Sequence, residues 1–134
     1  MTPNPVTLDS KASIADAWDL MRENVIRHVP VVDGGILVGM LSDRDLGHLD
    51  VGRILAFDGA AAARAELARP VIDSMSADVI FVHPETEVSD VIDLLLEARI
   101  GAVPVVLPDS REIVGIVSYI DILRGLGHVL EAAR

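Results

Sequence analysis

The chain contains one pattern twice, and this repeat limits the possible folds more than any other feature of the sequence. VGMLSDRDL, at 38–46, returns as VGIVSYIDI at 114–122 with its glycine, serine and aspartate in the same places. Each copy is a run rich in valine, isoleucine and leucine, typical of a buried strand. A serine three residues ahead of an aspartate follows, which is typical of a helix start. The pattern therefore predicts the same strand-to-helix junction in both halves.

The two junctions are Ser42 with Asp45 and Ser118 with Asp121. At such a junction the serine hydroxyl, the first free backbone N–H groups and the carboxylate lie within one helical turn. They lie at the positive end of the helix dipole, where a phosphate can bind. The same pattern also has an explanation without a ligand, because a serine and an acidic residue at this spacing form a capping box. The spacing alone leaves both interpretations open.

The sequence around the junctions repeats as well. MTPNPVTL (1–8) corresponds to MSADVIFV (75–82), and RHVPVV (27–32) corresponds to GAVPVV (101–106). Between them, 11–26 and 85–100 have helical apolar spacing, which in the first helix places Trp18 and Val25 on the buried face. The pair Gly34-Gly35 predicts a hairpin turn. Each copy thus has the order strand, helix, strand, strand, helix.

We therefore expect a mixed α/β (α+β) fold of two β-α-β-β-α repeats. Residues 1–49 form the first repeat, 50–74 a helical connector and 75–134 the second repeat. Neither small sheet can bury its apolar face alone, so the repeats are expected to pack around a pseudo-twofold axis.

Composition narrows the classes of function. A formal net charge of −10 argues against binding long nucleic acids, which depends on lysine and arginine contacts to phosphate. No apolar stretch reaches the roughly 20 residues that span a bilayer, and no signal sequence is recognisable, so we expect no membrane insertion and a cytoplasmic location. The sequence has no cysteine, and its four histidines lack metal-binding spacing. We expect no bound metal and no catalysis. An enzyme that acts on nucleotides is kept as an alternative hypothesis.

The last predicted helix is apolar over more than one face, which predicts a homodimer. Its apolar residues are Tyr119, Ile120, Ile122, Leu123, Leu126, Val129 and Leu130. The run Leu94–Leu96 in the second repeat's first helix supports the same expectation.

Over nearly its whole length the chain resembles a tandem CBS-domain pair of the small stand-alone bacterial type. The resemblance rests on MTPNPVTL, IRHVPVVDGGILVGMLSDRDL, VIFVHPET and IGAVPVVLPDSREIVGIVSYIDIL. It implies a regulatory module that senses AMP, ATP or another adenosyl ligand in clefts between the repeats. Occupancy would be transmitted to a partner protein that the sequence does not identify, and no further cofactor is implied. A dimeric adaptor with the same fold and empty sites is the alternative.

The resemblance also implies roles for individual residues. Asp45 and Asp121 would hold ribose hydroxyls, and Ser42 and Ser118 would contact phosphate. The first site would be lined by Thr7, Arg27, His28, Val29 and Pro30, and the second by Phe81, Ile100, Gly101, Ala102, Val103 and Pro104. Because Arg27, His28 and Arg44 occur only in the first copy, we expect the first site to bind the anion. The second is expected to form a more apolar slot for adenine.

Overall fold

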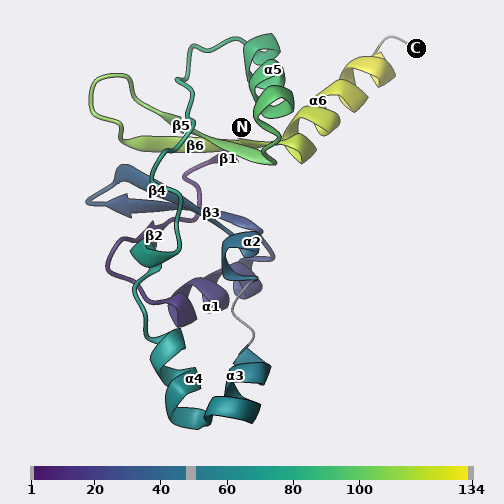
Figure 1. Ribbon diagram of the computed structural model, residues 1–134. Helices are drawn as coiled ribbons and strands as arrows, with labels where there is room; N and C mark the ends of the chain where they lie inside the picture. The colour runs from purple at the N-terminus through teal and green to yellow at the C-terminus, as the bar shows by residue number, and fades with distance from the viewer. Residues whose placement is uncertain (1, 48–50, 133–134) are drawn as a thin grey trace. The chain divides into compact units, whose positions relative to one another are not determined.

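The computed structural model describes residues 2–47 and 51–132, which form two compact units (Figure 1). One unit is Val6–Val79. The other combines Met1–Pro5 with Ile80–Arg134 and is called the Ile80–Arg134 unit. The mixture of helices and strands confirms the predicted α+β class.

The Val6–Val79 unit is built on a three-stranded sheet of order β2–β3–β4, with β2 parallel and β4 antiparallel to β3. Its elements are β2 (Leu8–Asp9), α1 (Ile14–Asn24), β3 (His28–Asp33), β4 (Ile36–Ser42), α2 (Asp43–Leu46), α3 (Val51–Asp58), α4 (Ala60–Leu67) and the 3-10 turn η1 (Val71–Asp73). The helices α1 and α2 lie on the same side of this sheet (Figure 1). Together with the sheet, they enclose a core that includes Ile14, Val29 and Leu41.

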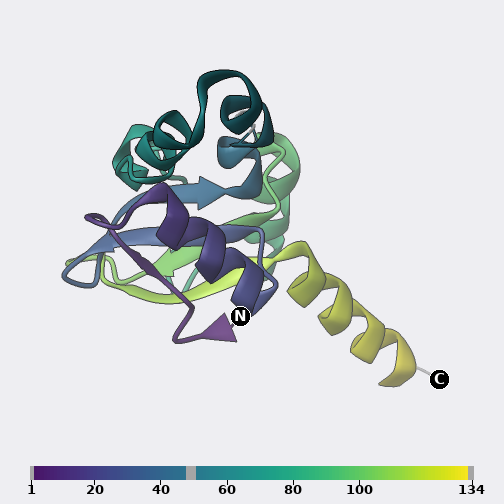
Figure 2. The ribbon, with the colours of Figure 1, turned by 90° about the horizontal axis from the view of Figure 1, so that it is seen from below.

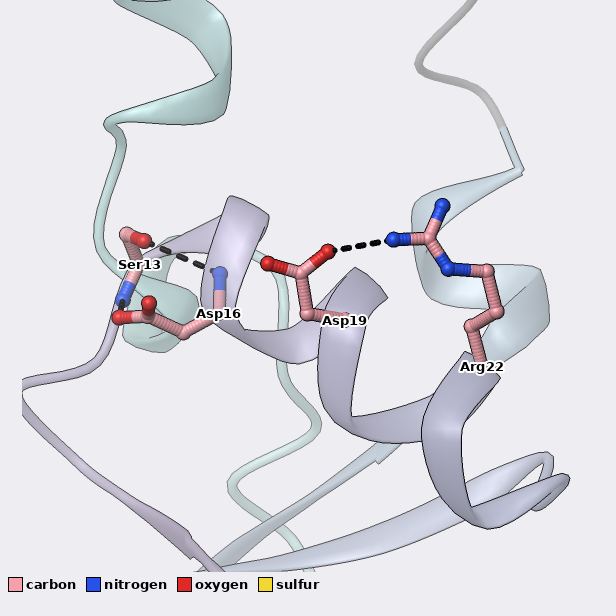
Figure 3. A network of polar contacts seen from close by, with 4 residues as sticks. All are labelled: Ser13, Asp16, Asp19 and Arg22. Carbon is pink, nitrogen blue, oxygen red and sulfur yellow. Dashed lines mark hydrogen bonds and ion pairs between the residues drawn. The ribbon is translucent and has the colours of Figure 1, made fainter.

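Helix α1 begins at a capping box that Figure 3 shows from close by. The Asp16 N–H donates to Ser13 Oγ at 3.2 Å, and the Ser13 N–H donates to the Asp16 carboxylate at 3.0 Å. On the exposed side of the helix, Arg22 pairs with Asp19 at 2.9 Å. The box satisfies backbone groups that would otherwise lack partners at the helix start.

Two residues predicted on the buried face of α1 are exposed, so that prediction was wrong for them. The buried stripe consists of Ile14, Ala17 and Met21. Trp18 is 43% exposed because it lies about 100° around the helix from Ala17. Val25 is 90% exposed because the helix has already ended there, in a left-handed residue with φ of 53°.

The turn between β3 and β4 confirms the predicted hairpin. Gly34 and Gly35 have φ values of 58° and 84°, which a two-residue hairpin turn requires and glycine adopts without strain. The connector is helical as predicted, with α3, α4 and η1 between Val51 and Asp73. His48 and Asp50 lie outside the described residues.

The Ile80–Arg134 unit has a second three-stranded sheet, of order β1–β6–β5, in which each neighbouring pair is antiparallel. Its elements are β1 (Thr2–Pro3), α5 (Val88–Ala98), β5 (Ala102–Val106), β6 (Ile113–Ser118) and α6 (Tyr119–Ala132). Leu95 of α5 and Val103 of β5 belong to its core. Helix α6 continues directly from β6 and extends away from the sheet (Figures 1 and 2).

Each repeat's sheet receives the segment that precedes the other repeat. Thr2 and Pro3 pair with Ile116 and Gly115 of β6. Correspondingly, the backbone of Ser76 exchanges hydrogen bonds of 2.9 and 3.0 Å with Met40 of β4. The aligned sequences 1–8 and 75–82 did not predict this exchange. The repeat boundaries at 1–49, 50–74 and 75–134 stay predictions.

Among the helices of the described ranges, none combines the length and the apolar character needed to cross a membrane.

Candidate functional site

The first junction lies where β4 ends at Ser42 and α2 begins at Asp43. The Ser42 N–H donates to Asp45 Oδ2 at 2.8 Å, and the Asp45 N–H donates to Ser42 Oγ at 3.2 Å. Both side chains are half-buried. The cap thus uses one carboxylate oxygen of Asp45, and Oδ1 makes no hydrogen bond within the described part of the chain. This oxygen can accept a hydrogen bond from a ligand.

The second junction repeats this geometry at the start of α6. The N–H and the hydroxyl of Ser118 both donate to Asp121 Oδ2, at 3.0 and 3.2 Å. In return the Asp121 N–H donates to Ser118 Oγ at 3.3 Å. As at the first junction, Asp121 Oδ1 makes no hydrogen bond to any described residue.

The box at Ser13 and Asp16 is a third copy of the Ser-x-x-Asp pattern, which the sequence analysis did not single out. It begins a helix that does not continue directly from a strand, unlike the helices at the two junctions. The residue that corresponds to Ser13 in the second repeat is Glu87, whose side chain makes no cap. Capping therefore accounts for the Ser–Asp hydrogen bonds without a ligand, and the Ser13 box is an internal reference for the two junctions.

Several predicted residues surround the first junction. His28 pairs with Ser42 across β3 and β4, and the Asp43 N–H donates to the Arg27 carbonyl at 2.9 Å. The start of β3 is thereby fixed against the start of α2. Arg27 and Arg44 are exposed at this end of the hairpin.

The other predicted residues of the first site lie deeper or farther along the sheet. Val29 and Pro30 are fully buried in β3, so neither residue presents a surface to a ligand in this structure. Thr7 is half-buried and immediately precedes β2, whose Leu8 pairs with Val31 of the same central strand.

The second junction has the same support from its own strand. Ala102 pairs with Ser118, and the Tyr119 N–H donates to the Gly101 carbonyl at 3.1 Å. Ile100 is half-buried ahead of the strand, whereas Val103 and Pro104 are fully buried within it.

Arg111 packs against the ring of Phe81, a contact that the sequence did not predict. The Arg111 guanidinium lies 4.8 Å from the centre of the Phe81 ring, and the His83 ring meets the same phenyl edge-on at 5.7 Å. Arg111 comes from the turn between β5 and β6, which is longer than the turn of the first repeat. Because it has no counterpart there, comparison of the copies could not detect it.

Burial lowers the pKa of His28, and the charges of Arg44 and Arg27 act in the same direction. The carboxylates of Asp43 and Asp45 oppose this effect without reversing it. The imidazole at the first junction is therefore neutral near pH 7. Within the described residues, no group of three or more histidine, aspartate or glutamate side chains could hold a metal ion.

Several known proteins are similar to this chain in sequence over most of its length. The chain is 30% identical over 122 residues to the CBS domain-containing protein YhcV of Bacillus subtilis, which covers 91% of this chain and 79% of YhcV. It is 34% identical over 134 residues to an uncharacterised 33.4 kDa protein of Thermofilum pendens, covering 95% of this chain. The match spans only 44% of that relative, and a further match spans 21% of the L-aspartate semialdehyde sulfurtransferase of Methanocaldococcus jannaschii.

Solved structures agree with the fold. CBSX2 in complex with AMP superposes with a TM-score of 0.79 and 29% identity, over 100% of this chain and 95% of that one. AcuB from Vibrio cholerae, a putative acetoin utilization protein, superposes with a TM-score of 0.77 and 32% identity. The superposition covers 98% of this chain and 89% of AcuB. The CBS domain pair of MJ0100, in complex with 5′-methylthioadenosine and S-adenosyl-L-methionine, superposes with a TM-score of 0.70 and 29% identity. The superposition covers 94% of this chain and 92% of the MJ0100 pair.

A family model of the CBS domain matches residues 1–49 and 68–128. The matched segments contain the two copies of the sequence pattern, which confirms the prediction of a tandem pair. The chain belongs to the CBS domain family.

Proposed function

We propose that this protein is a regulatory, ligand-sensing module that binds an adenine nucleotide or another adenosyl compound at the two Ser–Asp junctions. The observation that carries the proposal is the half-used carboxylate at each junction. Asp45 and Asp121 each have one oxygen in the cap and one without a partner in the described residues. A carboxylate only accepts hydrogen bonds, so the remaining oxygen suits a ribose hydroxyl. The AMP complex of CBSX2 and the adenosyl complex of MJ0100 support this class of ligand.

The two junctions differ in the groups that could bind a phosphate. Helix α6 has 14 residues, so its N-terminus has a developed dipole beside Ser118. Helix α2 has only four residues, so its dipole is small. A phosphate at the first junction would therefore be bound mainly by the exposed Arg27 and Arg44. We therefore place the anion of a phosphorylated ligand at the first junction, because guanidinium groups form charge-assisted contacts with phosphate.

The proposal includes a binding role rather than a catalytic one, a homodimer, a regulated partner protein and a cytoplasmic location. The dimer is supported by α6, on which Ile120 and Leu123 are 59% and 63% exposed. In the Leu94–Leu96 run, Leu96 is 61% exposed and Leu95 is fully buried.

A second candidate is a dimeric adaptor whose junctions bind nothing. The Ser13–Asp16 box favours it, because that box has the same hydrogen bonds in a helix start that does not continue a strand. In this case Asp45 and Asp121 only stabilise helices.

Asparagine substitutions separate the two candidates, with Asp16→Asn as the matched control. Asparagine can still accept the serine N–H through Oδ1, but it lacks the charge and the second acceptor oxygen. Asp45→Asn and Asp121→Asn should each weaken the binding of AMP at their own junction about tenfold, or ~1.4 kcal/mol. Asp16→Asn should leave the affinity for AMP unchanged. It should change the free energy of unfolding by about as much as Asp45→Asn and Asp121→Asn do. Calorimetric titration gives the affinities, and urea unfolding gives the stabilities.

A ligand screen supplies the second readout. AMP, ATP, NAD, S-adenosylmethionine and cyclic di-AMP are each added during thermal unfolding. A ligand at about a hundred times its dissociation constant stabilises the protein by roughly 2.7 kcal/mol, which raises the melting temperature by a few degrees. If Arg44 holds the phosphate, Arg44→Ala should weaken ATP more than adenosine. Unchanged melting with all five compounds would contradict ligand sensing and favour the adaptor.

A further inference from the structure

A pocket opens between α5 and α6 within the Ile80–Arg134 unit, with a volume of about 580 Å³. Its floor consists of three buried core residues of the unit, Val82, Val91 and Val105. Val88 and Leu126 also line it and are 67% and 54% exposed, so they lie at its open side. The pocket is therefore a recess with a closed floor, and its volume is usual for a small-molecule site. We call it the α5–α6 pocket.

The start of α6 explains why this space exists. The Tyr119 hydroxyl donates to the Leu95 carbonyl of α5 at 3.3 Å, which ties the two helices together at this point. Beyond it α6 extends away from the sheet (Figure 2), so its next turns leave space beside the first half of α5. Gly125 lines the pocket, and a Cβ added there would meet no atom within 4 Å. The absence of a side chain at this position thus keeps the pocket open.

The polar groups of the pocket accept hydrogen bonds. Asp121 Oδ2 accepts the N–H and the hydroxyl of Ser118, whereas Oδ1 makes no hydrogen bond within the described ranges. His83 Nδ1 lies 3.0 Å from the Val106 carbonyl oxygen, which can only accept, so Nδ1 carries the proton and Nε2 of the neutral ring is an acceptor. Thr86 Oγ1 accepts the His83 backbone N–H at 3.0 Å. A ligand that fits these groups must supply donors.

The charges at the pocket favour a cation. Among the described residues that line it, Asp121 is the one aspartate, glutamate, lysine or arginine, and Arg124 of the same helix does not line it. Glu85 and Glu87 are exposed next to lining residues just before α5. The whole chain has a formal net charge of −10, which attracts cations and repels anions. A carboxylate or phosphate in the pocket would meet this repulsion without a cation to pair with.

We propose that the α5–α6 pocket binds a small hydrophobic amine. Its ammonium group donates to Asp121 Oδ1, and its apolar body packs against the valine side chains of the floor. An ammonium group has donors and no acceptor, and its hydrogen bond to a carboxylate is charge-assisted. Burial of the apolar body supplies the rest of the affinity.

The pocket is distinct from both features of the proposed function. An anionic nucleotide does not match its chemistry, so its ligand differs from the one proposed for the two junctions. Ile120 and Leu123, whose exposure supports the dimer, do not line the pocket. An amine and a second copy of the chain therefore use different residues of α6.

Asp121 nevertheless connects the pocket to the second junction, and this part of the inference rests on the proposed function. Asp121 Oδ1 is the oxygen that would accept a ribose hydroxyl at that junction. An amine and an adenosyl ligand then compete for it, and each lowers the affinity of the other by the same factor. No residue of the first junction lines the pocket, so AMP held by Asp45 is not affected.

The first test uses three molecules with the same apolar body, which are 4-phenylbutylamine, 4-phenylbutanol and 4-phenylbutanoate. Calorimetric titration of the full chain should show that the amine binds about tenfold or more tightly than the carboxylate, with the alcohol between them. Asp121→Asn should remove most of the advantage of the amine over the alcohol. The affinity for the alcohol should stay nearly unchanged, because the apolar walls are intact.

The second test compares Gly125→Leu with Gly127→Leu. Both variants replace a glycine of α6 at an open position by a better helix former, but only Gly125 lines the pocket. Gly125→Leu should weaken the binding of the amine and of the alcohol about tenfold or more, because leucine fills the space. Gly127→Leu should bind both like the wild type. With Asp45→Asn present to silence the first junction, saturating AMP should raise the apparent dissociation constant of the amine.

The outcomes separate this inference from the proposed function. The pocket inference is overturned, whether or not AMP binds, if the amine shows no saturable binding or binds no more tightly than the carboxylate. Equal binding by the two leucine variants overturns it as well. Amine binding by a chain that binds no AMP supports the pocket and rejects the sensor. An amine affinity that does not change when AMP occupies the second junction overturns the shared use of Asp121.

Discussion

His28 gives the first repeat a titratable side chain at a position where the second repeat has none. It stands half-buried at the start of β3, opposite Ser42, and the second repeat has Ala102 at the corresponding place. Burial lowers its pKa in the folded protein below the ordinary value of 6.5. Asp43 and Asp45 attract the proton, whereas Arg27 and Arg44 repel it. Folding therefore opposes protonation at this one position.

The sign of the pH dependence follows from that shift. Well above pH 6.5 the imidazole is neutral in both the folded and the unfolded state and adds no pH dependence. As the pH falls from there toward the lowered folded pKa, the unfolded chain binds a proton that the folded chain does not. The free energy of unfolding should therefore decrease through this window. Urea unfolding measured in steps of pH tests this, with His28→Ala as the control because Ala102 is accommodated at the same register. A variant with the same slope as the wild type would show that another group titrates.

At the residue scale, the repeated pattern predicted the residues of the two junctions, whereas a residue in a turn of unequal length was missed. Ser42, Asp45, Ser118 and Asp121 form the hydrogen-bonded junctions that the repeated pattern indicated. Arg111 was missed because it lies in a turn whose length differs between the copies.

At the scale of elements, the close packing of Met75 on β4 explains a glycine. A Cβ at Gly39 would overlap the Met75 thioether, and the next residue, Ser76, is hydrogen-bonded to Met40. The segment that follows the connector is thus held against the middle of the strand by both side chain and backbone.

Gly39→Ala should consequently destabilise the Val6–Val79 unit by about 1 kcal/mol, at the low end of the range for overpacking, because the overlapping atoms belong to the flexible end of Met75. Met75→Ala in the same chain should remove part of that loss, because the overlapping group is gone. Chemical unfolding of the two single variants and the double variant measures the coupling. Gly127→Ala is the control, since a Cβ there meets open space. Strictly additive losses at Gly39 and Met75 would contradict the contact.

Elements with a clear periodicity were predictable, and very short ones were not. The Gly34-Gly35 hairpin and the helical connector appear as expected. The strand Thr2–Pro3 has two residues, too few to show any alternation, and its partner lies in the other repeat. The direction in which α6 leaves β6 was not predictable either.

At the scale of the whole molecule, the exchange of strands makes the Ile80–Arg134 unit depend on the N-terminus. Removing residues 1–5 deletes β1 and leaves β6 with β5 as its remaining partner. Amide hydrogen exchange should then become faster in β5 and β6, because fewer contacts oppose local opening. Exchange in β3 and β4 should stay unchanged, since their unit starts at Val6. Equal protection of β6 with and without residues 1–5 would contradict a stabilising role for β1.

The same exchange sets an order of events during synthesis on the ribosome. β1 is synthesised well before Gly115 and Ile116, the residues with which it pairs. At roughly 5–20 residues per second, the first strand waits about ten seconds for its partner. The Val6–Val79 unit is continuous in sequence and can complete its sheet earlier. The second repeat is thus completed by a segment that is synthesised ahead of the first repeat.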